Sequence, residues 1–233
     1  MAWFWGSRAP AEATRPPGLH SQALKALLGG LRPGSRHGVL DLGPPLAANV
    51  QFLSALSCRL RIADLHRSLC AESIESRRPE AVGALLERLL PLAPGERFDA
   101  LLAWDVFDYM RPDQVSALMT RLAAACGPET PVLVLASTER EIPAAPLRYR
   151  ILDSENLTCE GPREPRRASP RHTQPDLARM MPGFSVRRSV LLRSGLQEYL
   201  FVRGAGDEPA RVRVAGASRG LSPRVPWFRR GPL

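Results

Sequence analysis

Short apolar runs alternate with helical patterns between residues 21 and 136 of the chain. Two of these runs, FDALLAW and PVLVLA, are apolar almost throughout, as expected for strands buried on both faces. The pattern predicts strands at 37–42, 59–64, 98–104 and 131–136, and helices at 21–31, 47–57, 79–90 and from Pro112 to Gly127. Alternation of this kind is typical of βαβ units around a mostly parallel sheet.

Apolar positions within the predicted helices indicate which faces are buried. They recur at three- and four-residue spacing, which predicts core-facing stripes: Val50, Leu53 and Leu56 in one helix, and Val115, Leu118, Met119 and Leu122 in another. After Asp64 the chain holds no clear third strand, and the short run at 89–92 is the nearest candidate.

The last part of the domain changes its pattern. A short helix is predicted at 174–181, and the runs at 184–192 and 197–202 flank a turn at Ser194-Gly195, which predicts an antiparallel hairpin. The expected fold class is α/β: a single Rossmann-like, doubly wound, mostly parallel sheet that ends in an antiparallel hairpin.

Composition divides the chain into three segments. Residues 1–18 have no hydrophobic periodicity, which predicts a flexible leader, and residues 19–203 are expected to form the domain. Residues 204–233 are rich in Gly, Pro and Arg, which predicts a disordered basic tail. Residues 161–175 carry four prolines and four arginines and predict a long surface loop.

The formal charge of +9 is unevenly distributed over the 233 residues. It is +3 over residues 1–35, −4 over 36–160, +6 over 161–203 and +4 over 204–233. The basic loop and tail allow a nucleic-acid partner. Since Lys25 is the single lysine, the arginine excess also has a plainer interpretation, a GC-rich coding sequence.

The cysteines and apolar runs indicate the compartment. The four cysteines form no CxxC pair and have no histidine at a metal-ligand spacing, so we expect reduced thiols and no metal site. No apolar run reaches the roughly 20 residues of a membrane helix, and the start lacks the order of a secretory signal. These features predict a cytoplasmic protein without a transmembrane segment.

The sharpest local signal is VLDLGPPLAAN at 39–49, where a strand meets an acidic residue, a glycine and a helix. Ligands of open α/β sheets bind at the carboxyl ends of the strands. Asp41 at this corner disfavours a pyrophosphate and favours a ligand with a positive charge, because a carboxylate repels the first and attracts the second.

Here the chain resembles the class I S-adenosylmethionine-dependent methyltransferases. Asp41-Leu42-Gly43 is similar to the opening of their first motif, and Asp64, 23 residues on, is similar to the acidic residue that ends their second strand. The run FDALLAWDVFDYM at 98–110 resembles their fourth strand and the turn after it. The strand order and terminal hairpin agree, over about residues 20 to 203. Where the family has further glycines, this chain has Pro45 and Ala47.

The resemblance implies S-adenosylmethionine as cofactor and an unidentified methyl acceptor. It assigns cofactor binding to Asp41, Gly43, Pro44, Pro45, Asp64, Trp104 and Asp105, and substrate contact to Asp108 and Tyr109. It assigns no catalytic residue, because methyl transfer depends mainly on alignment of the reacting atoms. The acceptor pocket is expected from the turn after Trp104 and from residues 140–171.

Each of these residues also has a structural interpretation. Asp41 could cap the following helix, Asp64 could end a strand, and Asp105 and Asp108 could be solvated charges at a helix start. Trp104 and Tyr109 could be core residues. Two hypotheses follow: a methyltransferase, or an inactive methyltransferase-like protein that contacts nucleic acid or a protein partner through its basic loop and tail.

Overall fold

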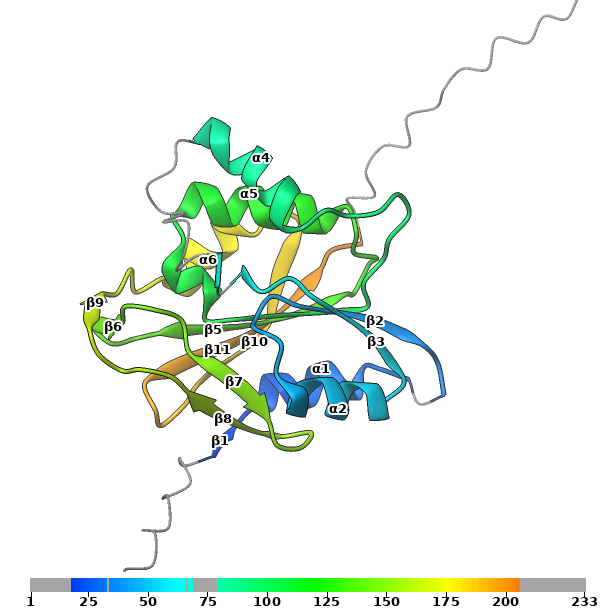
Figure 1. The fold of residues 1–233 in the computed structure, drawn as a ribbon, viewed down its shortest axis with the longest axis horizontal. Helices are drawn as coiled ribbons and strands as arrows, with labels where there is room; N and C mark the ends of the chain where they lie inside the picture. The colour runs from blue at the N-terminus through cyan, green and yellow to red at the C-terminus, as the bar shows by residue number, and fades with distance from the viewer. Residues whose placement is uncertain (1–17, 33, 66, 69–78, 206–233) are drawn as a thin grey trace, which may run out of the picture.

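A computed structural model describes residues 18–32, 34–65, 67–68 and 79–205 (Figure 1). Its centre is a six-stranded sheet with the order β10-β11-β5-β4-β2-β3. The strands are β2 (His37–Asp41), β3 (Cys58–Ile62), β4 (Ala100–Trp104), β5 (Pro131–Ser137), β10 (Phe184–Leu191) and β11 (Leu196–Arg203). Strands β3, β2, β4 and β5 are parallel, and β11 lies antiparallel between β5 and β10. The predicted fold class is confirmed.

The order of the strands decides where a site can form. The chain leaves β2 for β3 on one side and returns to β4 on the other, so β2 pairs with both. This reversal is the switch point at which ligands of open α/β sheets bind, outside the carboxyl ends of the strands. Asp41 ends β2 and Trp104 ends β4, so the sheet places these two residues at the switch point.

Helices cover both faces of the sheet (Figure 1). They are α1 (Gln22–Gly29), α2 (Ala47–Ala55), α4 (Pro79–Leu89), α5 (Pro112–Ala123) and α6 (Gln174–Met180). Helices α1 and α2 share one core cluster with one side of the sheet, and α4, α5 and α6 share a second cluster with the other side. The predicted stripe of α5 is buried in full, from Val115 to Leu122, and Pro112 lies in its first turn.

The buried face of α2 differs from the prediction. Val50 and Leu56 are exposed, whereas Asn49 and Leu53 are buried. The reason is Asn49, whose amide donates to the carbonyl of Tyr149 and accepts from the amide of Ile151. These two hydrogen bonds turn the polar side chain inward and rotate the helix relative to its apolar stripe.

Two small sheets were not predicted. Strands β1 (Leu19–His20), β8 (Asn156–Glu160) and β7 (Arg148–Ile151) form one, and β6 (Glu141–Pro143) pairs with β9 (Arg166–Ala168) in the other. The surface loop predicted at 161–175 is therefore wrong in part, since residues 166–168 form β9. The candidate strand at 89–92 is also wrong: Leu89 ends α4, and residues 90–92 form no strand.

Some of the predicted features fall on residues that the structure does not describe. Residues 1–17 of the predicted leader and 206–233 of the predicted tail lie outside the described residues, as does Cys70. Cys58 and Cys126 are buried free thiols, and Cys159 is half-buried. Among the described helices, none is long and apolar enough to cross a membrane.

Glu198 connects β11 to the start of α1. Its buried carboxylate accepts from the Ser21 hydroxyl at 2.6 Å and from the amides of Gln22 at 2.8 Å and Ala23 at 3.2 Å. Glu198→Ala leaves these buried donors without an acceptor, so we expect the free energy of unfolding to fall by about 3 kcal/mol.

Urea unfolding followed by circular dichroism measures this loss. Glu160→Ala is the control, because Glu160 makes an exposed ion pair with Arg150, which is worth about 0–1 kcal/mol. Equal losses in the two variants would contradict a capping role for Glu198.

Candidate functional site

Asp41 lies at the centre of the strand tips and is almost completely buried. Its Oδ1 accepts from the Gly43 amide at 2.8 Å and from the Trp104 indole Nε1 at 2.6 Å. Burial raises the pKa of Asp41 to about 6, against the lowering effect of these hydrogen bonds. Helix α2 has Leu46 at its N-cap, so Asp41 does not cap that helix.

Trp104 closes the space beside Gly43. A Cβ placed on Gly43 would lie 2.9 Å from the indole Cδ1 and 3.0 Å from Nε1. The indole also stacks on the Tyr149 ring, with ring centroids 5.6 Å apart and an angle of 7° between the planes. Trp104 also has a φ of 51°, which is strained for a bulky residue. Trp104 is therefore part of the core and lies at the position where the resemblance places the cofactor.

Asp64 lies two residues beyond the end of β3, next to the tip of β2. The Ala63 amide donates to the Asp41 carbonyl, and the Leu65 amide donates to the Leu42 carbonyl, so the two loops are joined by backbone hydrogen bonds. The charge of Asp64 contributes to the raised pKa of Asp41. The Asp64 side chain is half-buried, and its Oδ1 accepts from the Arg67 amide at 3.2 Å. The structure thus brings the two predicted carboxylates to one edge.

The two prolines of the turn lie outside the core. Pro44 is half-buried and Pro45 is exposed. The helix that follows begins at Ala47. The side chains nearest to the open face of Gly43 are those of Trp104 and Asp41, and neither proline is among the nearest atoms to that face.

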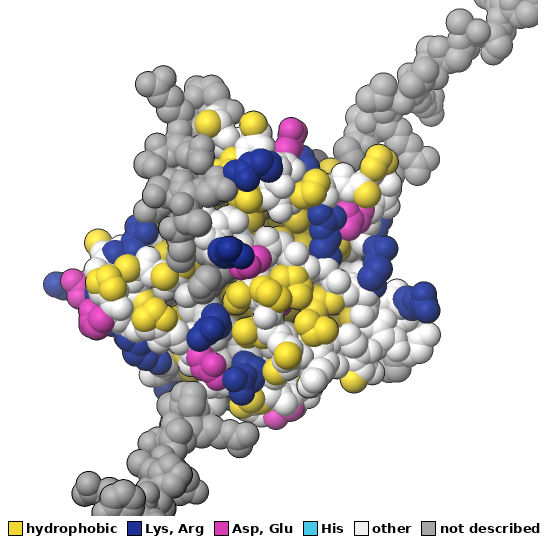
Figure 2. Space-filling model, in the orientation of Figure 1, with side chains coloured by type: hydrophobic (Ala, Val, Ile, Leu, Met, Phe, Trp, Pro, Cys, Tyr) yellow, Lys and Arg dark blue, Asp and Glu magenta, His cyan; other side chains and the backbone are white. Residues whose placement is uncertain are grey.

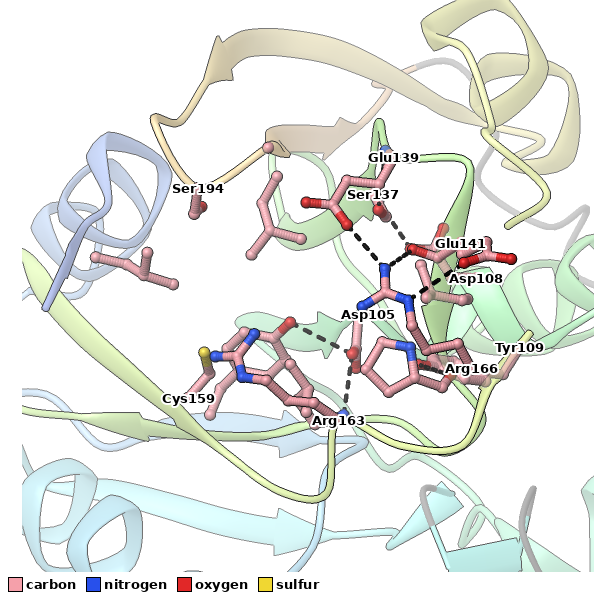
Figure 3. Close-up of a pocket in the computed structure, with 17 residues that line it drawn as sticks. Asp105, Asp108, Tyr109, Ser137, Glu139, Glu141, Cys159, Arg163, Arg166 and Ser194 are labelled. Atoms are coloured by element: carbon pink, nitrogen blue, oxygen red, sulfur yellow. Dashed lines mark hydrogen bonds and ion pairs between the residues drawn. The ribbon is translucent and has the colours of Figure 1, made fainter. Parts of the chain in front are cut away.

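A hollow of about 140 Å³ lies beyond the tip of β4 (Figure 3). It is bordered by the turn after Trp104, by the ends of β5 and β6, by the β7–β8 sheet and by the β10–β11 turn. Polar and charged lining residues are Asp105, Asp108, Tyr109, Ser137, Glu139, Glu141, Tyr149, Cys159, Arg163, Arg166 and Ser194. The predicted acceptor-pocket segments, the turn after Trp104 and residues 140–171, both contribute to this hollow. Asp41, Gly43 and Asp64 do not line it.

Asp105 and Asp108 are the two buried carboxylates of the hollow. The Oδ2 atom of Asp105 accepts from the Leu147 amide at 3.1 Å and from the Tyr149 hydroxyl at 3.3 Å. The Oδ2 atom of Asp108 accepts from the Ser137 amide at 2.8 Å. Both residues are at most 5% exposed, so they are not solvated charges at a helix start.

Burial changes the acidity of both groups. It raises the pKa of Asp105 to about 7 and that of Asp108 to about 8. The hydrogen bonds oppose this rise, and the charge of Asp105 adds to the rise at Asp108. Buried carboxyl groups with pKa values near neutrality in a concave site are candidates for ligand binding or proton transfer.

Tyr109 and the basic segment are held by contacts within the protein. The Tyr109 hydroxyl donates to the carbonyls of Pro143 and Ala145, and Arg167 lies over its ring at 5.7 Å. Arg166 forms ion pairs with Glu139 and Glu141. On the face drawn in Figure 2, Lys and Arg side chains are scattered among acidic and apolar ones. These contacts do not favour residues 161–175 as a nucleic-acid interface.

Comparison with known proteins gives matches in structure alone. No protein-family model and no curated protein matches the sequence. The chain is similar to 1,6-didemethyltoxoflavin-N1-methyltransferase of Burkholderia thailandensis, solved with 1,6-didemethyltoxoflavin and S-adenosylhomocysteine, at 17% identity over 79% of each chain and a TM-score of 0.43.

Two further solved structures are similar at the same level. N-methyltransferase NodS of Bradyrhizobium japonicum WM9 matches at 13% identity, over 78% of this chain and 93% of that chain, with a TM-score of 0.44. Magnesium protoporphyrin IX methyltransferase of Synechocystis PCC 6803, with bound S-adenosylmethionine, matches at 15% identity, over 78% and 77%, with a TM-score of 0.42. The fold assignment of this chain rests on its own strand order.

Proposed function

We propose that this chain is an S-adenosylmethionine-dependent methyltransferase in which Trp104 occupies the cofactor's position until the cofactor displaces it. The observation that carries this proposal is the meeting of Asp41, Gly43 and Asp64 at the switch point of the sheet. Trp104 connects this point to the acidic hollow, because it donates to Asp41 and stacks on Tyr149, which lines the hollow. The cofactor would supply the activated methyl group. The hollow would hold the acceptor.

The residues at the strand tips fit the cofactor in chemical type. Asp64 is accessible and its carboxylate suits hydroxyl donors such as those of a ribose. Asp41 places a carboxylate where a sulfonium or ammonium charge would be attracted. Space is the requirement that remains: the Trp104 indole must leave the face of Gly43 and give up its hydrogen bond to Asp41.

Titration calorimetry of the full chain with S-adenosylhomocysteine tests this function. We expect saturable binding, and we expect Asp64→Asn to weaken it about tenfold or more, because hydrogen bonds to a charged group are worth about 1.5–3 kcal/mol. Asp113→Asn is the matched control, since Asp113 is an exposed carboxylate at the start of α5. A flat titration of the wild-type chain would overturn the proposal.

A second candidate is an inactive, methyltransferase-like binding protein. The observation that favours it is that Asp41, Trp104 and Tyr149 already satisfy one another without a ligand. It predicts a flat titration both in the wild-type chain and in variants of Trp104.

A nucleic-acid partner through residues 204–233 stays a prediction. An affinity for nucleic acid that falls steeply with salt, and that disappears when these residues are deleted, would support it.

A further inference from the structure

The shape of the hollow limits what it can hold. Its volume of about 140 Å³ is close to that of cavities that bind benzene. Its apolar lining residues are Leu19 of β1, Ile142 and Pro143 of β6, Leu147 before β7, and Leu196 of β11. A single ring or a short alkyl group matches this space.

Two acceptor atoms of residues that line the hollow have no hydrogen-bond partner within the described residues. These are the Oδ1 atoms of Asp105 and Asp108, each with less than 1 Å² of its surface accessible, while the Oδ2 atoms are hydrogen-bonded. An acceptor that is buried without a donor costs free energy, about 1–3 kcal/mol or more for a charged group. A ligand that supplies N–H donors would recover this cost.

Acidic groups outnumber basic ones around the hollow. Glu139 and Glu141 lie at its border with Arg166, which forms ion pairs with both (Figure 3). Burial raises the pKa of the Cys159 thiol, against the lowering effect of the nearby Arg163. Among the acidic residues that line the hollow, Asp105 and Asp108 therefore have the least compensation from basic lining residues.

Arg167 adds one positive charge from outside the lining. It lies over the Tyr109 ring and lowers the pKa of Asp108, but less than burial raises it. Above the pKa values of Asp105 and Asp108, about 7 and about 8, both carboxyl groups are ionised, and the charge of this part of the hollow is then complementary to a cation.

We propose that this hollow binds a small organic amine, with its nitrogen at Asp105 and Asp108 and a ring or short alkyl group against the apolar wall. An ammonium group offers three N–H donors, enough for both Oδ1 atoms. Charge-assisted hydrogen bonds of this kind are about twice as strong as neutral ones. The binding of an amine does not depend on the proposed function. The identification of this amine as the methyl acceptor does rest on it.

Titration with three probes that share one aromatic ring and are similar in size tests the proposal: benzylamine, benzyl alcohol and benzoate, each added to the full chain without cofactor. We expect benzylamine to bind at least tenfold more tightly than benzyl alcohol, and benzoate to bind least. Asp105→Asn and Asp108→Asn each remove one carboxylate while keeping its shape, and each is expected to weaken benzylamine binding about tenfold. Glu87→Gln, on the exposed surface of α4, is the control for net charge.

The results separate the chemical alternatives. Equal affinity for amine and alcohol would show an apolar pocket and overturn the proposal, and a preference for benzoate would overturn it in favour of an anion site at Arg163. The absence of binding by all three probes would also overturn it. Circular dichroism shows whether each variant is folded. If benzylamine binds and S-adenosylhomocysteine does not, the amine site stands and the proposed methyltransferase function fails.

Discussion

Replacing Trp104 by Ala is expected to strengthen the binding of S-adenosylhomocysteine by about 30-fold or more. In the wild-type chain the cofactor must first break the hydrogen bond from the indole to Asp41 and the stacking on Tyr149. A hydrogen bond to a charged group contributes about 1.5–3 kcal/mol and an aromatic pair about 0.5–1.5 kcal/mol. A ligand that has to open the site loses this amount from its affinity.

Trp104→Phe separates the two contributions. It keeps a ring for Tyr149 but removes the N–H donor, so we expect a gain of about tenfold, between the wild-type chain and the Ala variant. Trp104 is buried, and its truncation costs about 3–5 kcal/mol of stability. Thermal unfolding in the absence of ligand therefore accompanies each titration, and the Phe variant keeps the test valid if the Ala variant is unfolded.

Fluorescence gives a second readout of the same event. Trp104 is the only tryptophan within the described residues, and its indole is buried. Displacement into water should shift its emission to longer wavelength, and the shift should be absent from Trp104→Phe. Wild-type binding with an affinity equal to that of both variants would contradict the displacement of Trp104, and titrations that are flat in all three chains would favour the cofactor-free binding protein.

The sheet could be predicted because its signals are local. Strands β4 and β5 are continuous apolar runs, and β10 and β11 flank a turn at Ser194-Gly195. The spacing of Asp41 and Asp64 follows from one βαβ unit, so their meeting at one edge could also be expected from the sequence. These predictions needed only the periodicity of apolar positions along the chain and the rule that the carboxyl ends of parallel strands lie at a common edge.

The strands of the two small sheets had a weaker signal in the sequence. In β7, Tyr149 and Ile151 are buried while Arg148 and Arg150 are exposed, an alternation over only four residues. A half-buried strand of this length is difficult to separate from a loop. The inward rotation of Asn49 depends on two backbone groups 100 and 102 residues away, and no local pattern contains that information.

The orientation of the site residues could not be predicted either. Trp104 was expected to contact the cofactor, and its place in the chain did not show that the indole would turn toward Gly43 and close that space. Asp108 has the sequence position of a solvated first-turn residue, yet its side chain is buried and accepts from the Ser137 amide. Side-chain direction after a strand depends on packing by distant segments, which sequence spacing does not determine.

The protein is expected to lose stability as the pH rises, because the carboxyl group of Asp108 is buried. Burial raises its pKa in the folded state from the ordinary value of 3.8 to about 8. Between these two values the folded state holds a proton that the unfolded state has lost, so the free energy of unfolding falls as the pH increases. Below about pH 4 both states are protonated, and above about pH 8 the full penalty is present.

Asp108→Asn should remove most of this dependence. A shift of this size corresponds to about 4–6 kcal/mol, since each pH unit contributes about 1.4 kcal/mol. Asp105 titrates in the same range and the two groups interact, so part of the slope will remain in the variant. We expect Asp108→Asn to raise the free energy of unfolding by about 3–5 kcal/mol near pH 9 and to change it little near pH 4.

Urea unfolding at a series of pH values measures the effect, with no amine present. Asp113→Asn is the control of opposite sign, because the Arg111 guanidinium lowers the pKa of Asp113 and its small contribution is present above its ordinary pKa and lost as the pH falls. A wild-type stability that stays level between about pH 5 and pH 9 would mean that Asp108 ionises at little cost. Its Oδ1 would then have a partner such as water, and the electrostatic argument for an amine in the hollow would lose one of its two carboxylates.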